Sequence, residues 1–225
     1  MSEEAPNPDL DLDRELARAR KEMVLELKRR GIKDERLLAA MLKVPRHLFI
    51  SRGLWHLAYG DHPLPIAAGQ TISQPYIVAL MVETLAVRQE DRVLEIGTGS
   101  GYETALLAEL AAEVYTVERV AELLEGAERL LSGLGYRNIR FHLGDGTQGW
   151  ADHAPYDRII ASGSVPQVPH SLIFQLADPG RLVIPVGDRH LQEVVLLQKA
   201  EGEIFRERLV PCSFLPLIGE EGWRN

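Results

Sequence analysis

A chain of 225 residues is long enough for one sizeable hydrophobic core, so one main domain is expected. Hydrophobic residues make up 45% of it and charged residues 26%, which excludes a disordered chain or a collagen-like repeat. The net charge of −8 is concentrated beyond residue 90, where 12 basic side chains stand against 20 acidic ones, and this argues against a nucleic-acid partner.

Nothing in the sequence suggests export or a membrane. The start, Met1 to Asp13, is acidic and contains proline, unlike a signal peptide, and no apolar run approaches the roughly 20 residues that a membrane helix needs. A single cysteine, Cys212, cannot form an internal disulfide. We therefore expect a cytoplasmic protein without a membrane partner, and we favour a monomer.

The first third of the chain predicts two helices and a long connection. Apolar residues recur at helical spacing in the first helix, which ends at residues 28–31; they are Leu16, Ala19, Met23 and Leu27. Asp34 is suited to cap a second helix, which Pro45 stops. Glycines and prolines between residues 45 and 75 predict an ordered connection with at most a short helix near 51–57. Long irregular segments of this kind are often functional.

From Arg92 onward, short apolar runs alternate with amphipathic stretches. Strands are expected at 93–96, 114–117, 139–143 and 158–161, with helices at 102–110 and 120–131. A helix at 169–176, a turn at 178–180 and a strand at 182–184 follow, and residues 194–198 and 204–210 form an antiparallel hairpin. The pattern predicts an α/β fold with a doubly wound, mostly parallel sheet in residues 77–225, preceded by helices and a covering loop in residues 1–76.

A glycine-rich loop follows the first of these strands. It reads Glu95-Ile96-Gly97-Thr98-Gly99-Ser100-Gly101 and opens a helix, so the backbone can approach a ligand closely. A dinucleotide fingerprint would need glycine at position 102, where Tyr102 stands. The spacing therefore favours S-adenosylmethionine over a nicotinamide cofactor.

The next two strands each end in an acidic residue. Glu118, 23 residues beyond Glu95, could accept both hydroxyls of a ribose. Gly144-Asp145-Gly146 closes the third strand, where Asp145 could accept a hydrogen bond from an adenine amino group. Each motif alone could be a turn or a helix cap, but the three in order favour a cofactor site.

The connection carries Pro63-Leu64-Pro65-Ile66 and then Gly69-Gln70-Thr71-Ile72-Ser73-Gln74-Pro75-Tyr76. With these strings the sequence resembles the protein-L-isoaspartate O-methyltransferase family of class I S-adenosylmethionine-dependent methyltransferases. The resemblance begins at Val44-Pro45-Arg46, includes the glycine loop and reaches Val183-Ile184-Pro185-Val186-Gly187.

The resemblance implies a Rossmann-like methyltransferase fold and methyl transfer to the free α-carboxylate of isoaspartyl residues in damaged proteins and peptides. The ester closes to a succinimide, which begins repair, and S-adenosylhomocysteine is the other product. Carried over to this sequence, Ser73 orients the substrate carboxylate, and Thr71, Ile72 and Gln74 line the cleft. The implied cofactor-binding residues are Glu95, Gly97, Thr98, Gly99, Gly101, Glu118, Asp145 and Gly146. No catalytic base is expected, because a carboxylate is already ionised at pH 7.

Two departures from the family pattern keep an alternative open. Ser162-Gly163-Ser164 stands where the family has an alanine-rich run, and Glu103 replaces a common glutamine. Another acceptor, a small molecule or a particular peptide, is therefore a second hypothesis, and an inactive module that binds abnormal aspartyl sites is a third. Without the family, Ser73 would be a turn or N-cap residue. No histidine pair has metal-ligand spacing, so no metal is expected.

Overall fold

The computed structural model describes residues 8–224, which include a seven-stranded sheet. The strand order is β5-β4-β3-β6-β7-β8-β9, and the first five of these are parallel. Their bounds are β3 (Arg92–Ile96), β4 (Glu113–Glu118), β5 (Ile139–Leu143), β6 (Tyr156–Ala161) and β7 (Leu176–Gly187). Strands β8 (Gln192–Ala200) and β9 (Glu203–Cys212) are antiparallel, which confirms the predicted C-terminal hairpin. The prediction about the acidic start of the chain lies, up to residue 7, outside the described residues.

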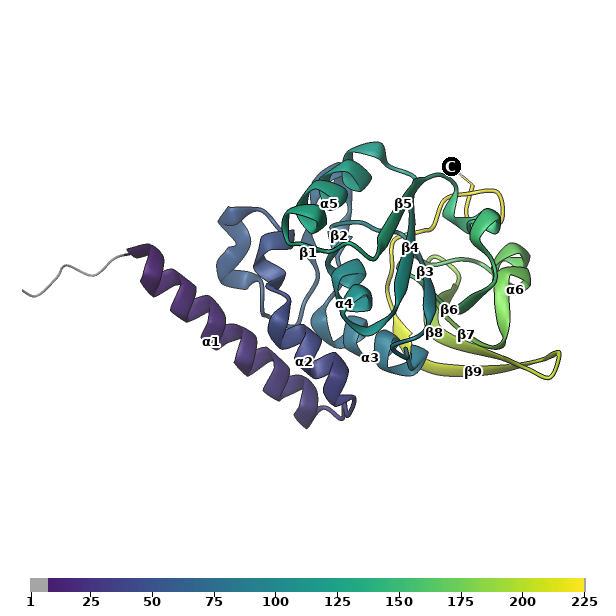
Figure 1. The fold of residues 1–225 in the computed structure, drawn as a ribbon, viewed down its shortest axis with the longest axis horizontal. Helices are drawn as coiled ribbons and strands as arrows, with labels where there is room; N and C mark the ends of the chain where they lie inside the picture. Colours follow the sequence, from purple (N-terminus) through teal and green to yellow (C-terminus); the bar gives the residue numbers. More distant parts are fainter. Residues whose placement is uncertain (1–7, 225) are drawn as a thin grey trace, which may run out of the picture.

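The central strands are apolar throughout because both faces of the sheet are covered. Successive residues of a strand point to opposite faces. Val93 accordingly packs in the core on one side of the sheet, and its neighbour Leu94 packs in the core on the other. Helices α4 (Tyr102–Leu110) and α5 (Ala121–Gly133) lie on one side in Figure 1, and α6 (His170–Gln175) lies on the other. The doubly wound arrangement predicted from the alternation of elements is confirmed.

The N-terminal region contains α1 (Pro8–Arg29) and α2 (Glu35–Lys43), followed by short elements of the predicted connection. The Asp34 carboxylate caps α2, accepting hydrogen bonds from the backbone N–H groups of Arg36 (2.9 Å) and Leu37 (3.2 Å). The short elements are the 3-10 turns η1 (Arg46–Phe49), η2 (Arg52–Leu57) and η3 (Ala67–Gly69), and the antiparallel pair β1 (Leu64–Pro65) and β2 (Thr71–Ile72). The predicted short helix near residues 51–57 is confirmed as η2.

Two features differ from the predicted elements. Helix α3 (Pro75–Leu85) was not predicted, because it is apolar on almost every side and shows no amphipathic stripe. The turn predicted at residues 178–180 does not separate a helix from a strand. Strand β7 continues through these residues, with a shift of register against β6. There the Asp178 carboxylate accepts hydrogen bonds from the backbone of Glu201 and Gly202 and so holds the hairpin turn. No helix within residues 8–224 is long and apolar enough to cross a membrane.

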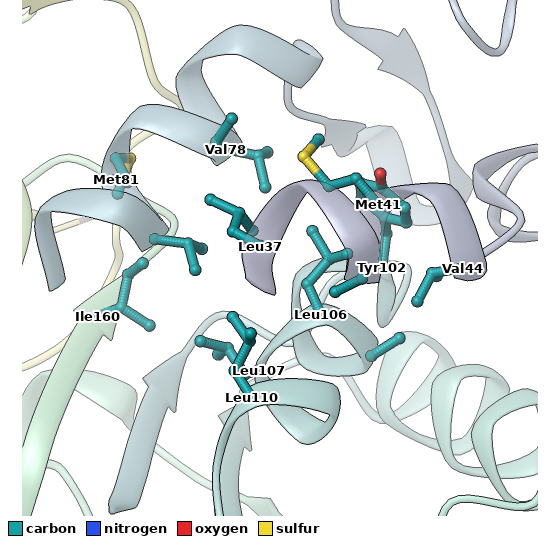
Figure 2. Close-up of a cluster of buried hydrophobic side chains, with 14 of the residues drawn as sticks. Leu37, Met41, Val44, Val78, Met81, Tyr102, Leu106, Leu107, Leu110 and Ile160 are labelled. Atoms are coloured by element: carbon teal, nitrogen blue, oxygen red, sulfur yellow. The ribbon is translucent and has the colours of Figure 1, made fainter. Parts of the chain in front are cut away.

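One hydrophobic core joins the N-terminal helices to the sheet. Figure 2 shows side chains of α2, α3 and α4 meeting one another and the strand β6. The labelled residues include Leu37, Met41, Val78, Met81, Leu106, Leu107, Leu110 and Ile160. The division of the chain at residue 76 stays a prediction; the packing itself is continuous across that point.

Neighbouring residues of α2 provide a test of this core. Met41 is fully buried, whereas Leu42 is 40% exposed. Met41→Ala should lower the free energy of unfolding by about 2–5 kcal/mol, because it leaves a cavity between α2 and α4. Leu42→Ala should change it by less than about 1 kcal/mol. Urea unfolding of both variants measures the difference. If Met41→Ala lowers the free energy of unfolding as little as Leu42→Ala does, α2 is not part of the cooperative core.

Candidate active site

A cavity opens at the carboxyl ends of β3, β4 and β6. The chain runs from β3 outward through β4 and β5, then returns to β6 on the other side of β3, so the strand order reverses here. Open α/β sheets bind ligands at such a switch point. The cavity is lined by residues 70–73, 97–100, 102–103, 118–120, 162–163 and 215–218, with Val78 and Leu123. The glycine loop, Glu118 and the Ser73 segment, which come from separate motifs, thus line one cavity.

The glycine loop brings its backbone to the wall of this cavity. Gly97 has φ of 93°, a left-handed conformation that side chains of other residues rarely adopt. At Gly101, a Cβ atom would lie 3.0–3.1 Å from side-chain atoms of Leu131 and Ala127, so the start of α4 packs directly against α5. Gly97, Thr98 and Gly99 therefore line the cavity, whereas Gly101 lies behind it in the helix packing.

Glu95 supports the glycine loop from the interior of the protein. It is fully buried, and its Oε2 accepts hydrogen bonds at 2.6 Å from the hydroxyls of Thr104 and Thr116. The Thr116 hydroxyl lies 2.6 Å from that of Thr98, which belongs to the loop. Burial, and secondarily the nearby Glu103, raise the pKa of Glu95 well above its usual value. The structure thus places Glu95 behind the cavity wall, in a network that joins β3, β4 and α4.

Glu118 combines a structural contact with a position on the cavity. Its Oε1 accepts hydrogen bonds from the backbone of Arg119 (2.8 Å) and Val120 (3.0 Å), and its Oε2 accepts one from Gly99 (3.0 Å). The side chain is only 7% exposed and lines the cavity. The carboxylate that ends β4 is therefore fixed against the glycine loop and faces the space where a ligand would lie.

The Ser73 segment forms the opposite wall. Thr71, Ile72 and Ser73 line the cavity, whereas Gln74 lies outside it at the N-cap of α3. The fully buried Arg46 donates from Nη2 to the Ser73 carbonyl and from Nε to the Ala58 carbonyl, each at 2.8 Å. Desolvation lowers the pKa of Arg46 to about 10, so it stays charged at neutral pH. Sequence reasoning noted Arg46 only within a family motif and missed that it fixes the backbone of Ser73.

A second contact fixes the same segment from the N-terminal helices. The Asp61 carboxylate accepts hydrogen bonds from the Tyr76 backbone (2.8 Å) and from the Gln74 side chain (3.3 Å). Arg30, at the end of α1, forms an ion pair with Asp61, and its guanidinium lies 3.6 Å from the centre of the Tyr76 ring. The first helix therefore anchors the start of α3, directly after Ser73.

Asp145 and Gly146 lie beside the cavity, outside its lining residues. Asp145 caps the turn η4 (Gly146–Gln148), with Oδ1 accepting from the Thr147 backbone (2.9 Å) and hydroxyl (2.7 Å). Its Oδ2 accepts from the backbone of Glu220 at 2.8 Å. Asp145, with Thr147, thus helps to hold the C-terminal segment that follows β9.

That C-terminal segment was missed by sequence reasoning. Leu215, Pro216, Leu217 and Ile218 line the cavity. Backbone hydrogen bonds with Ser164 fix them, since the Leu215 carbonyl accepts from it at 2.9 Å and the Leu217 N–H donates to it at 2.8 Å. No local sequence pattern predicts this pairing, because its partners are about fifty residues apart.

The two departures from the family pattern contact each other. The Ser162 hydroxyl donates to Oε1 of Glu103 at 2.7 Å, and both residues line the cavity. Burial raises the pKa of Glu103 to about 7, although the bond from Ser162 opposes the shift. Within residues 8–224, no group of three or more histidine, cysteine, aspartate or glutamate side chains could hold a metal ion.

Comparisons with known proteins agree on one family. A family model described as protein-L-isoaspartate(D-aspartate) O-methyltransferase matches residues 18–222. The protein-L-isoaspartate O-methyltransferase of Methanoculleus marisnigri is 53% identical over 209 residues, which are 92% of this chain and 95% of the relative. Another match is the solved structure of a protein-L-isoaspartate O-methyltransferase with a TM-score of 0.82 and 29% identity, over 90% of this chain and 67% of that one. A Plasmodium falciparum protein of the same designation, in complex with S-adenosyl-L-homocysteine, has a TM-score of 0.78 and 28% identity, over 88% and 97% of the two chains.

The buried Glu103 predicts a dependence of stability on pH. Its pKa of about 7 in the folded protein exceeds the ordinary 4.5, so the folded state binds the extra proton between these values. Stability of the ligand-free protein should therefore fall as the pH rises through that range, at about 1.4 kcal/mol for each unit of pKa shift. Glu103→Gln removes this effect. The free energy of unfolding of the variant, relative to that of the wild type, should therefore rise by a few kcal/mol from pH 5 to pH 8.

Urea unfolding at the two pH values measures this gain, with Glu128→Gln as the control because Glu128 is exposed on α5. If both variants follow the wild type equally at both pH values, Glu103 is not a proton-binding group of the folded state.

Proposed function

The chain belongs to the protein-L-isoaspartate(D-aspartate) O-methyltransferase family, and we propose that it methylates the free α-carboxylate of L-isoaspartyl residues in damaged proteins and peptides, using S-adenosylmethionine. The methyl ester then closes to a succinimide, which starts repair. The observation that carries this proposal is that the Ser73 segment and the glycine loop with Glu118 line one cavity. A methyl acceptor on one wall and a methyl donor on the other would meet there.

The residues present fit S-adenosylmethionine. Its ribose needs hydrogen-bond acceptors, and Glu118 offers a buried, fixed carboxylate at the end of β4. The backbone of Gly97, Thr98 and Gly99 leaves room for a ligand to approach closely. In this proposal Glu95 and Gly101 support the loop, while Asp145 and Gly146 close the adenine end from beside the cavity. S-adenosylhomocysteine, the product, would occupy the same place.

Catalysis would come from positioning. When bound, S-adenosylmethionine supplies an electrophilic methyl group, so that a carboxylate lone pair forms the new O–C bond while the C–S bond breaks and sulfur keeps its electron pair. Ser73 is half-buried, and no hydrogen bond to its hydroxyl occurs within residues 8–224. The hydroxyl can therefore donate to one oxygen of the substrate carboxylate and orient the other. Because that carboxylate is ionised at neutral pH, alignment and exclusion of water suffice.

The proposal also covers the localisation, the oligomeric state and the partners of the enzyme. We place it in the cytoplasm, where single cysteines such as Cys212 stay reduced, and we favour a monomer. Its partners would be isoaspartyl proteins and peptides, without nucleic acid or membrane. A second acceptor class, a small molecule or a particular peptide, is favoured by one observation only, the altered Glu103–Ser162 pair in the cavity wall.

A pair of peptides that differ only in isoaspartate or normal aspartate at one position tests the acceptor. With labelled S-adenosylmethionine, we expect base-labile methylation of the isoaspartyl peptide alone. Only in that peptide does the main chain continue through the β-carbonyl and leave the α-carboxylate free. Cofactor binding without methylation of either peptide would favour the second acceptor class. The absence of cofactor binding would contradict the proposed function.

Two substitutions separate the two walls of the cavity. Ser73→Ala should lower kcat by about tenfold to a hundredfold, the value of a hydrogen bond to a charged group, with little change in cofactor affinity. Glu118→Ala should weaken cofactor binding by about 1–3 kcal/mol, because it removes a charged hydrogen-bond acceptor. Steady-state kinetics and calorimetry measure both effects.

Ser132→Ala is the matched control for Ser73→Ala, because Ser132 is exposed on α5 and does not line the cavity. Full activity of Ser73→Ala would remove Ser73 from the mechanism.

A further inference from the structure

The cavity contains a carboxylate that the mechanism above does not use. Glu103 lines the cavity and is only 8% exposed. Its Oε1 accepts the Ser162 hydroxyl at 2.7 Å, and within residues 8–224 its Oε2 has no hydrogen-bond partner. Its Oε2 is not enclosed by protein atoms, so a group of a ligand in the cavity could contact it directly. A positively charged group there would compensate the poorly solvated carboxylate.

The strand order indicates which part of the cosubstrate lies beside Glu103. Glu118 ends β4 on one side of β3, and Ser162 follows β6 on the other. If Glu118 binds the ribose, a ligand that crosses β3 brings its methionine part toward Ser162 and Glu103. The methyl group must also face Ser73, which lines the same cavity. In that arrangement the sulfur would lie between the ribose and the Glu103–Ser162 pair.

The charges around Glu103 come from three elements. Glu95 of β3 lies beneath the loop, and Glu118 ends β4. Arg119, also on the cavity, is exposed to solvent, while Arg46 lies 5.0 Å from the centre of the Tyr102 ring and is bonded to two carbonyls. Burial raises the pKa values of both Glu95 and Glu103. The pKa of Glu103, raised by burial to about 7, lies near neutral pH, so its charge changes in that range.

The donor and the product differ in charge at one atom. S-adenosylmethionine carries a sulfonium cation, and S-adenosylhomocysteine carries a neutral thioether; the remaining groups are the same. A carboxylate in a poorly solvated cavity attracts a nearby cation much more strongly than it would in water. On the basis of the proposed function, we propose that Glu103, positioned by Ser162, is a specificity residue that favours the sulfonium cosubstrate over the thioether product and so limits product inhibition.

Calorimetric Kd values for S-adenosylmethionine and S-adenosylhomocysteine, measured at pH 6 and pH 8 without a methyl acceptor, test this proposal. In the wild type, the ratio of the product Kd to the cosubstrate Kd should rise about tenfold with pH, as Glu103 ionises. In Glu103→Gln the ratio should not change with pH. At pH 8 that variant should bind the cosubstrate about tenfold more weakly and the product within about twofold of the wild type.

Two further variants provide a control and an intermediate case. Glu109→Gln is the matched control, because Glu109 is on the same helix α4 but outside the cavity, and its ratio should equal that of the wild type. Ser162→Ala keeps the carboxylate but removes its hydrogen bond, so it should give a ratio between those of the wild type and Glu103→Gln. If Glu103→Gln does not fold, the pH dependence of the wild type and of Ser162→Ala decides.

A wild-type ratio that is flat with pH, or equal weakening of both ligands by Glu103→Gln, would overturn the proposal and give Glu103 a purely structural role. Binding of neither ligand to the wild type would overturn the proposed function itself, and the two failures are therefore distinguishable.

Discussion

The hydrogen bonds that Glu95 accepts from two threonines fix the geometry of the cavity. A carboxyl group buried without partners would be strongly destabilising. Hydroxyls from α4 and β4 both donate to Oε2 of this one, whereas Oε1 has no partner within residues 8–224. The same network reaches Thr98 and thereby holds the glycine loop at the end of β3. The loop needs this support because its left-handed glycines have no intrinsic preference for a single conformation. Placing the network on strands and a helix gives the cofactor wall its rigidity.

The Ser73 wall depends on a different kind of constraint. Ser73 lies in an irregular segment, and such segments are mobile unless their backbone groups are bonded. Arg46 and Asp61 provide these bonds on either side of it, and Arg30 extends the contact to α1. The N-terminal helices thus do more than complete the core. They fix the position of the acceptor wall relative to a sheet that is far away in the sequence.

The parts predicted from the sequence are those in which neighbouring residues determine the structure. The alternation of apolar runs predicted the sheet because burial on both faces requires it. The glycine loop and Glu118 were found because the loop directly follows a strand and Glu118 ends one. Helix α3 was missed since apolar residues on almost every side of it remove the amphipathic pattern. Position at a strand end predicts the correct edge of the sheet but not which side chains face the cavity. The sequence therefore did not reveal that four of the predicted site residues lie behind or beside the cavity, namely Glu95, Gly101, Asp145 and Gln74. Contacts such as Arg46 with Ser73 and Ser164 with Leu215 join distant residues and leave no local signal.

Acidic groups are concentrated at this edge of the sheet, and Glu103 is the one that Ser162 contacts. A glutamine at position 103 would be neutral and could bond its neighbours without a proton, whereas a glutamate there adds charge beside Glu95 and Glu118. Its burial is tolerated because Ser162 donates a hydrogen bond to it, which a hydrocarbon side chain at that position could not do. Glu103 and Ser162 are 59 residues apart in the chain but form one unit of the cavity wall. A change in one therefore alters the electrostatic setting of the other, because the Ser162 hydroxyl is the hydrogen-bond donor to the Glu103 carboxylate.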